Sequence, residues 1–205
     1  MTILYYIHDP MCSWCWAFAP TWKKIQQHLS DKIKINYLLG GLAPDSDEPM
    51  PKDFQHTIAG YWQTIEEKVP GTRFNYNFWK ECAPKRSTHP ACRAVIATKI
   101  QNPSAENEMI NAIQVAYYLN AQNPSDLNTL ISLANSIGLN VKQFKIDINS
   151  LETNNQLVKE IEFSKQIGAR GFPSLVLEHN NQYQFIPLDY KNEMIALDAI
   201  EKIIK

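Results

Sequence analysis

Long apolar runs are absent from this sequence of 205 residues. No stretch approaches the roughly 18 consecutive apolar residues that indicate a membrane-spanning helix. The N-terminus, Met1-Thr2-Ile3-Leu4-Tyr5, has no basic segment followed by a cleavage pattern, so a secretory leader is not expected. Runs of one charge are absent too, since 20 Lys and Arg residues face 21 Asp and Glu residues. We therefore expect a cytoplasmic protein that binds neither nucleic acid nor membranes.

Cysteine is scarce, and its four residues include only one Cys-x-x-Cys pair, Cys12 and Cys15. A structural zinc site commonly uses two such pairs, and Cys82 and Cys92 are not spaced to supply the second. Zinc is therefore the weaker interpretation of this pair. The chain also has no glycine-rich phosphate loop and no serine nucleophile turn, so we predict neither a metal nor a cofactor.

The Cys-x-x-Cys pair lies between an expected strand and an expected helix. Residues 3–7 form a continuous apolar run of strand length, and residues 16–25 begin a helix-compatible stretch after the break at Asp9-Pro10. At the start of a helix, the positive end of the helix dipole stabilises the thiolate of Cys12, the form that attacks disulfides. Cys15 lies one helical turn further on and can close a ring with Cys12. The pair therefore predicts a dithiol–disulfide cycle.

Strands and helices are mixed in the first and last quarters of the chain. Alternating apolar residues predict a second strand over 33–39, ended by Gly40-Gly41. The last quarter predicts, in order, a helix closed by Gly168, strands over 174–177 and 183–185 joined at Asn180-Asn181, and an amphipathic helix over 194–204.

The middle of the chain shows helical spacing and no convincing strand. Asn102-Pro103 and Asn123-Pro124 each offer an N-cap followed by a first-turn proline. We therefore predict an α/β protein with one domain formed by residues 1–44 and 149–205. A helical domain over residues 45–148 interrupts it.

A proline opens the third predicted strand, in Gly168-Ala169-Arg170-Gly171-Phe172-Pro173-Ser174. One interpretation is a cis-proline loop beside the cysteine pair, in which Pro173 leaves the backbone of Phe172 free to pair with an extended substrate. The other is an ordinary trans turn, because only about 5% of X-Pro bonds in folded proteins are cis. The proline alone does not decide between them.

Taken together, the sequence resembles a DsbA-family thioredoxin-fold protein, in which helices interrupt the thioredoxin fold. More narrowly, it resembles the cytosolic DsbA-like predicted protein-disulfide isomerases. The similarity spans essentially the whole chain and depends on Asp9-Pro10-Met11-Cys12-Ser13-Trp14-Cys15-Trp16, Leu39-Gly40-Gly41-Leu42-Ala43-Pro44-Asp45, Arg86-Ser87-Thr88-His89-Pro90-Ala91-Cys92-Arg93 and Gly171-Phe172-Pro173-Ser174-Leu175.

The resemblance implies a thioredoxin fold of order β-α-β … α-β-β-α and catalytic roles for three residues. Cys12 is the implied nucleophile, Cys15 the resolving thiol and Pro173 a cis-proline. Ser13-Trp14 stands where the best-known periplasmic member has Pro-His. The missing histidine removes one source of thiolate stabilisation, so a strongly oxidising potential does not follow.

Met11, Trp14 and Phe172 are the expected substrate-binding residues, because exposed apolar side chains beside a reactive thiol can grip an unfolded chain. His8 is a weaker candidate for steadying the thiolate. Arg86 and Arg93 are either carboxylate binders or part of a solvated helix face.

Cys82 and Cys92 are open to two interpretations. Cys92 falls at an expected helix start, so it is either a second redox partner for Cys82 or, more simply, a partly buried thiol.

We predict a thiol–disulfide oxidoreductase of the protein-disulfide-isomerase kind, acting on protein or peptide disulfides. Glutathione or a thioredoxin-type protein is the expected reductant. Two alternatives stay open: a glutathione-dependent transferase or isomerase of the kappa-class or 2-hydroxychromene-2-carboxylate type, and a non-catalytic chaperone-like binding module.

Overall fold

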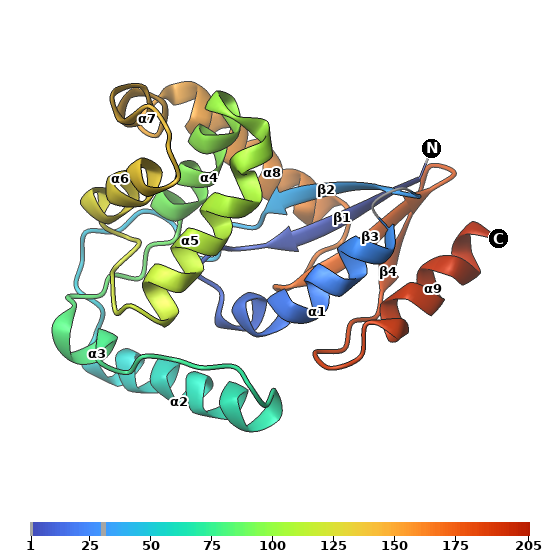
Figure 1. Cartoon of the computed structure of the whole chain (residues 1–205), viewed down its shortest axis with the longest axis horizontal. Coiled ribbons are helices and arrows are strands. Elements are labelled where there is room, and N and C mark those ends of the chain that lie inside the picture. The colour runs from blue at the N-terminus through green and yellow to red at the C-terminus, as the bar shows by residue number, and fades with distance from the viewer. Residues whose placement is uncertain (1, 30–31) are drawn as a thin grey trace.

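The computed structural model describes residues 2–29 and 32–205, and Met1 and residues 30–31 of the predicted first domain lie outside them. Its sheet has four strands in the order β2-β1-β3-β4. Strand β1 (Thr2–His8) pairs parallel with β2 (Lys34–Leu39) and antiparallel with β3 (Ser174–His179), which pairs antiparallel with β4 (Gln182–Ile186). The first and last parts of the sequence therefore form one sheet (Figure 1).

Helices cover both faces of the sheet, which explains the continuous apolar run of residues 3–7 in β1. Leu4 and Tyr6 face α1 (Ser13–Leu29) and α9 (Met194–Ile204), whereas Tyr5 and Ile7 face α8 (Leu151–Gln166). A strand buried on both faces has a continuous apolar run rather than an alternating one. The predicted α/β thioredoxin fold with inserted helices is confirmed.

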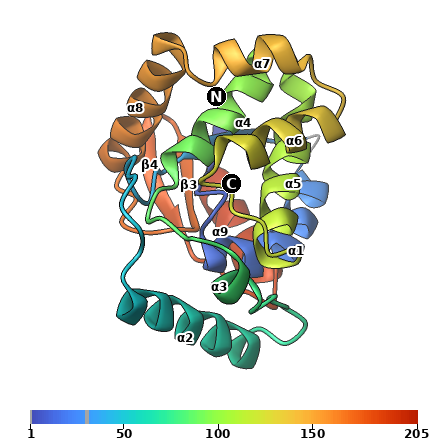
Figure 2. The same ribbon diagram turned by 90° about the vertical axis from the view of Figure 1, so that its left-hand side faces the viewer.

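The chain between β2 and α8 is helical in the part that the structure describes. It contains α2 (Lys52–Lys68), α3 (Phe78–Glu81), α4 (His89–Gln101), the short 3-10 helix η1 (Pro103–Ala105), α5 (Glu106–Tyr118), α6 (Leu127–Ser136) and α7 (Val141–Asp147). In two perpendicular views α2 lies at the bottom of the helical part and α7 at its top (Figures 1 and 2).

Trp62 of α2 lies in an aromatic cluster with Phe74, Phe78 and Tyr118 and is fully buried. Its neighbours belong to other segments of the helical part. The cluster therefore joins α2 to α3 and α5.

One predicted N-cap is wrong. Asn102 caps η1 by accepting a hydrogen bond from the backbone N–H of Ser104, but Asn123 accepts one from Ser125 within a turn, and α6 begins only at Leu127. An Asn-Pro pair fits a tight turn as well as a helix start, so the local signal could not separate the two.

None of the helices in the described ranges combines the length and the apolar character needed to cross a lipid bilayer.

Candidate active site

The cysteine pair lies at the junction between strand β1 and helix α1. Cys12 comes directly before the first helical residue, and its carbonyl accepts a hydrogen bond from the N–H of Trp16 at 3.0 Å. Both cysteines are free thiols, with Cys12 7% exposed and Cys15 fully buried. Cys12 lines the large groove described below and Cys15 does not. An incoming disulfide therefore meets Cys12 first.

Burial raises the pKa of the Cys15 thiol well above its ordinary value, and the adjacent Cys12 adds to the effect. Cys15 is therefore protonated at neutral pH while the pair is reduced. Only the thiolate attacks a disulfide, so this second thiol is held unreactive until its surroundings change.

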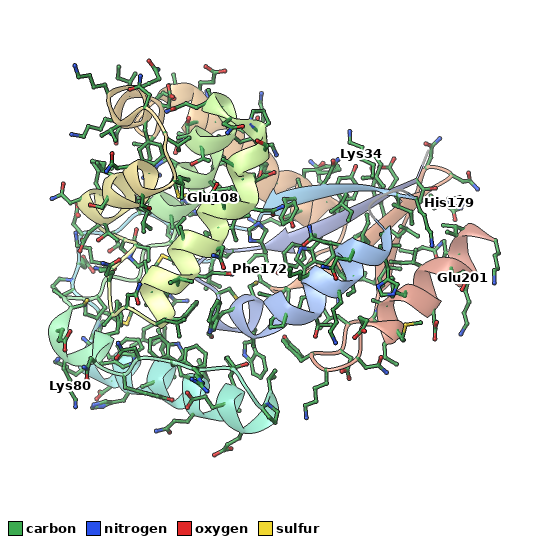
Figure 3. The ribbon with its side chains drawn as sticks, viewed as in Figure 1. Lys34, Lys80, Glu108, Phe172, His179 and Glu201 are labelled. Carbon is green, nitrogen blue, oxygen red and sulfur yellow. The ribbon has the colours of Figure 1, made fainter. Side chains whose placement is uncertain are left out.

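The Pro173 loop lies directly beside Cys12. The Phe172–Pro173 peptide bond is cis, and the Cys12 thiol donates to the carbonyl oxygen of Phe172 at 3.6 Å. Figure 3 shows Phe172 near the middle of the molecule, at the end of the sheet that faces the helical part. The structure thus brings Cys12, Phe172 and Pro173 together, although Cys12 and Phe172 are 160 positions apart in the sequence.

Gly40 makes room for the ring of Phe172. A Cβ atom at Gly40 would lie 1.9 Å from Cε1 and 2.1 Å from Cζ of that ring. The ring is half-buried and packs against the apolar residues under α8, such as Ile7 and Val176. Phe172 lines the groove, its carbonyl accepts from the Cys12 thiol, and its backbone N–H has no partner among the described residues.

The groove has a volume of about 590 Å³ and extends from Cys12 to α2. Met11, Trp14 and Phe172, the three residues that the sequence suggested for substrate binding, all line it. Met11 is almost buried, whereas Trp14 is half-buried against Tyr190, with 5.2 Å between the ring centres. Arg86, a candidate carboxylate binder from the sequence, also lines the groove, whereas the side chains of α2 and the other basic residues there were not part of the sequence prediction.

Asp9 is a buried carboxylate at the centre of this region. Its Oδ1 accepts from the N–H of Met11 at 2.8 Å, and its Oδ2 accepts from the N–H of Leu42 and the hydroxyl of Thr88, both at 2.7 Å. The Cys92 thiol donates to Oδ2 at 3.5 Å. Asp9 therefore ties the cysteine loop to the segment after β2 and to the start of α4.

Burial raises the pKa of the Asp9 carboxyl, although the hydrogen bonds from Leu42, Thr88 and Met11 oppose that shift. In the sequence, Asp9 marks only the break between the expected strand and helix and the start of a segment that carries the family resemblance. The one available signal was the acidic residue itself, directly next to an apolar strand.

Tyr118 of α5 is a second positioning group that the sequence did not reveal. Its hydroxyl donates to the carbonyl of Met11 at 2.7 Å, and its ring stacks on Trp16 at 5.7 Å. Trp16 also donates from Nε1 to the carbonyl of Arg73 at 3.1 Å. The loop before Cys12 is therefore held from the helical part as well as from the sheet.

Two weaker candidates lie elsewhere. Burial lowers the pKa of His8 to about 3, so its ring is neutral and supplies no positive charge to a thiolate. Arg93 forms a two-bond ion pair with Asp45, at 2.7 and 2.8 Å. Arg86, by contrast, lines the groove, with its guanidinium 4.7 Å from the ring centre of Phe54.

Cys82 and Cys92 are not joined. The Cys82 thiol donates to the carbonyl of Ala121 at 3.0 Å, whereas the fully buried Cys92 faces Asp9. Burial raises the pKa of both thiols. No group of three His, Cys, Asp or Glu side chains in residues 2–29 and 32–205 is arranged to hold a metal ion.

The chain is similar to several known proteins. A family model described as thioredoxin matches residues 5–188. A solved structure named "putative protein disulfide isomerase", from Nitrosomonas europaea, is 27% identical with a TM-score of 0.86, covering 99% of this chain and 97% of its own. The cytosolic disulfide reductase DsbM from Pseudomonas aeruginosa, also solved with GSH, is 18% identical with a TM-score of 0.79 over 98% of each chain, which shows a shared fold alone.

The curated relatives have a different kind of name. The ClpXP adapter protein SpxH of Halalkalibacterium halodurans is 28% identical over 87% of this chain and 59% of its own length. This chain thus spans about 60% of the length of the curated relatives it matches.

Proposed function

Because this chain belongs to the thioredoxin family, we propose that it is a thiol–disulfide oxidoreductase that works through Cys12 and Cys15. The observation that carries the proposal is the position of Cys12. Its thiol opens into the groove 3.6 Å from the Phe172 carbonyl, while Cys15 is buried one helical turn behind it. The DsbA-like oxidoreductases among its structural neighbours support the same chemistry.

In the reducing direction, the Cys12 thiolate attacks one sulfur of a substrate disulfide. The substrate S–S bond breaks, a bond forms between Cys12 and that sulfur, and the other substrate sulfur leaves as a thiolate that takes up a proton. Cys15 then loses its proton and attacks the sulfur of Cys12, which releases the second substrate thiol. The substrate gains two electrons, and the protein ends with a disulfide between Cys12 and Cys15.

The two thiols differ in exposure and in reactivity, in a way that suits this order of steps. The raised pKa of Cys15 keeps it from attacking first. Once Cys12 is in the mixed disulfide, Cys15 is one helical turn away from the sulfur that it attacks, so proximity compensates for its low thiolate fraction. A thiol such as glutathione, or a thioredoxin-type protein, then reduces the pair again. A cytoplasmic site of action is part of this proposal.

Reduction of insulin disulfides tests the proposal. We expect Cys12→Ser to abolish the activity and Cys15→Ser to accumulate mixed disulfides through Cys12, which non-reducing gels and peptide mass mapping detect. Cys82→Ser is the matched control, because Cys82 does not line the groove, and it should keep full activity. Unchanged insulin reduction by Cys12→Ser would overturn the proposal.

The same assay separates the proposal from the glutathione-dependent transferase or isomerase alternative. Such an enzyme needs glutathione but no resolving thiol. Activity that requires glutathione and survives Cys15→Ser would favour that alternative. The working direction, whether reductase, oxidase or isomerase, follows from the equilibrium of the pair with glutathione.

A second role is favoured by the sequence similarity to the SpxH proteins, which are named ClpXP adapters. In that role the protein would bind a partner and deliver it to ClpXP without redox chemistry. A variant with both Cys12→Ser and Cys15→Ser that still accelerates degradation of a bound partner by purified ClpXP would support the adapter role.

A further inference from the structure

The groove is basic although the chain as a whole is not. Lys85, Arg86, Lys165 and Arg170 all line it, and no Asp or Glu side chain does so in the described part of the chain. The net charge of the protein is −1, so this gathering of cations does not follow from composition.

These cations are largely free to meet a ligand. Lys85 pairs with the carboxylate of Asp47 at 3.2 Å, in an ion pair whose acidic partner is fully exposed. Arg86 contacts the ring of Phe54. Lys165 and Arg170 form no ion pair within the described residues. A groove of this charge attracts carboxylates and repels basic chains.

The wall opposite the cysteine loop is apolar. Helix α2 supplies Phe54, Ile58 and Tyr61 to it, and Tyr61 is 54% exposed. Exposed aromatic side chains beside a groove gain free energy by burial under an apolar ligand. An occupant that fits both walls therefore carries large apolar side chains as well as negative charge.

The backbone at the base of the groove favours an extended chain. The N–H of Phe172 is unpaired among the described residues, directly beside the carbonyl that faces the Cys12 thiol. A free N–H at this point can pair with the carbonyl of an extended peptide, as in strand addition.

We infer that the substrate is an extended protein segment in which acidic and large apolar residues flank the disulfide-bonded cysteine. This rests on the proposed function, since it names the substrate of the same site. The carboxylates meet the cations of Arg86 and Arg170, and the apolar side chains lie against α2. Glutathione carries carboxylates but no large apolar side chain, so it fills only the basic half of the groove.

The test uses the full-length reduced protein and measures the second-order rate constant for its oxidation by different disulfides. The probes are symmetric disulfides of one short peptide: an acidic form with Glu and Leu beside the cysteine, a basic form with Lys for Glu, and a polar form with Ser for Leu. Oxidised glutathione and uncharged hydroxyethyl disulfide complete the set.

We expect the acidic apolar peptide to react at least tenfold faster than its basic and polar forms. Arg170→Glu should slow that peptide about tenfold, because an attraction becomes a repulsion, and Tyr61→Ser should slow it several-fold. Each rate is divided by the rate of the same variant with hydroxyethyl disulfide, so that an effect of the substitution on Cys12 itself cancels and only the effect on recognition of the peptide is compared. Lys34→Glu is the matched charge control, since Lys34 lies at the far end of β2 from the groove and should leave every rate unchanged (Figure 3).

If hydroxyethyl disulfide oxidises the protein but the three peptides react at equal rates, the inference is overturned. Oxidised glutathione reacting as fast as the acidic apolar peptide, with no effect of Tyr61→Ser on either, would overturn it in favour of glutathione. If no disulfide oxidises the Cys12–Cys15 pair, the proposed function itself fails.

Discussion

The substitution Gly40→Ala tests how closely the chain after β2 supports the Pro173 loop. Carbon atoms in contact normally lie about 3.5–4.0 Å apart, whereas the new Cβ would be 1.9 Å from Cε1 of Phe172. The ring must therefore move by well over an ångström. Gly40 does not have a positive φ, so its backbone accepts alanine and the expected effect is steric.

Overpacking of this kind costs about 1–3 kcal/mol, and the reduced freedom of the unfolded chain returns about 0.4–1 kcal/mol. We expect Gly40→Ala to lower the free energy of unfolding by about 1–2 kcal/mol in urea denaturation. Because Phe172 also presents its carbonyl to Cys12, the same variant should slow insulin reduction.

Two further variants make the reasoning refutable. Gly60→Ala changes a glycine within α2 whose new Cβ has no atom within 4 Å, so it should stabilise the protein by about 0.5–1 kcal/mol. In a Phe172→Ala background the penalty of Gly40→Ala should disappear. A penalty of the same size in both backgrounds would show that the clash with Phe172 is not its cause.

Two more predictions concern buried groups. Burial in the folded protein raises the pKa of Asp9 above its value in the unfolded chain. Between about pH 4 and the raised pKa, the folded state therefore binds more protons than the unfolded state. The free energy of unfolding then falls as the pH rises, by up to about 1.4 kcal/mol per pH unit. In urea denaturation between pH 4 and 7, the free energy of unfolding of Asp9→Asn should fall less steeply with pH than that of the unsubstituted protein. An identical pH profile for the two would contradict the pKa shift. Glu160→Gln is the matched comparison, since burial raises the pKa of Glu160 too. Iodoacetamide should label the half-buried Cys82 in the native protein and Cys92 only after unfolding, as peptide mass mapping would show; equal labelling of the two would be inconsistent with the burial of Cys92.

The order of strands and helices could be predicted because it depends on local patterns. The apolar run of β1, the alternation in β2 and the Asn180-Asn181 turn each indicate their structure within a few residues. Both of those asparagines have a positive φ, as a hairpin turn requires.

The surroundings of the cysteines could be predicted only in part. Asp9 meets Leu42 and Thr88, which lie 33 and 79 positions away in the sequence, so no local pattern announces the contact. Nothing in the sequence distinguishes Arg86 from Arg93 as a candidate carboxylate binder. Arg86 lines the groove, yet Arg93 is paired with Asp45. Tertiary packing alone makes that difference.

The most direct test of the central claim is the redox equilibrium of the protein with glutathione, followed by peptide mapping under non-reducing conditions. We predict a single two-electron transition that converts Cys12 and Cys15 to one disulfide and leaves Cys82 and Cys92 reduced. Persistence of Cys12 and Cys15 as free thiols under oxidising conditions, or a disulfide that joins Cys12 to a different cysteine, would contradict the account.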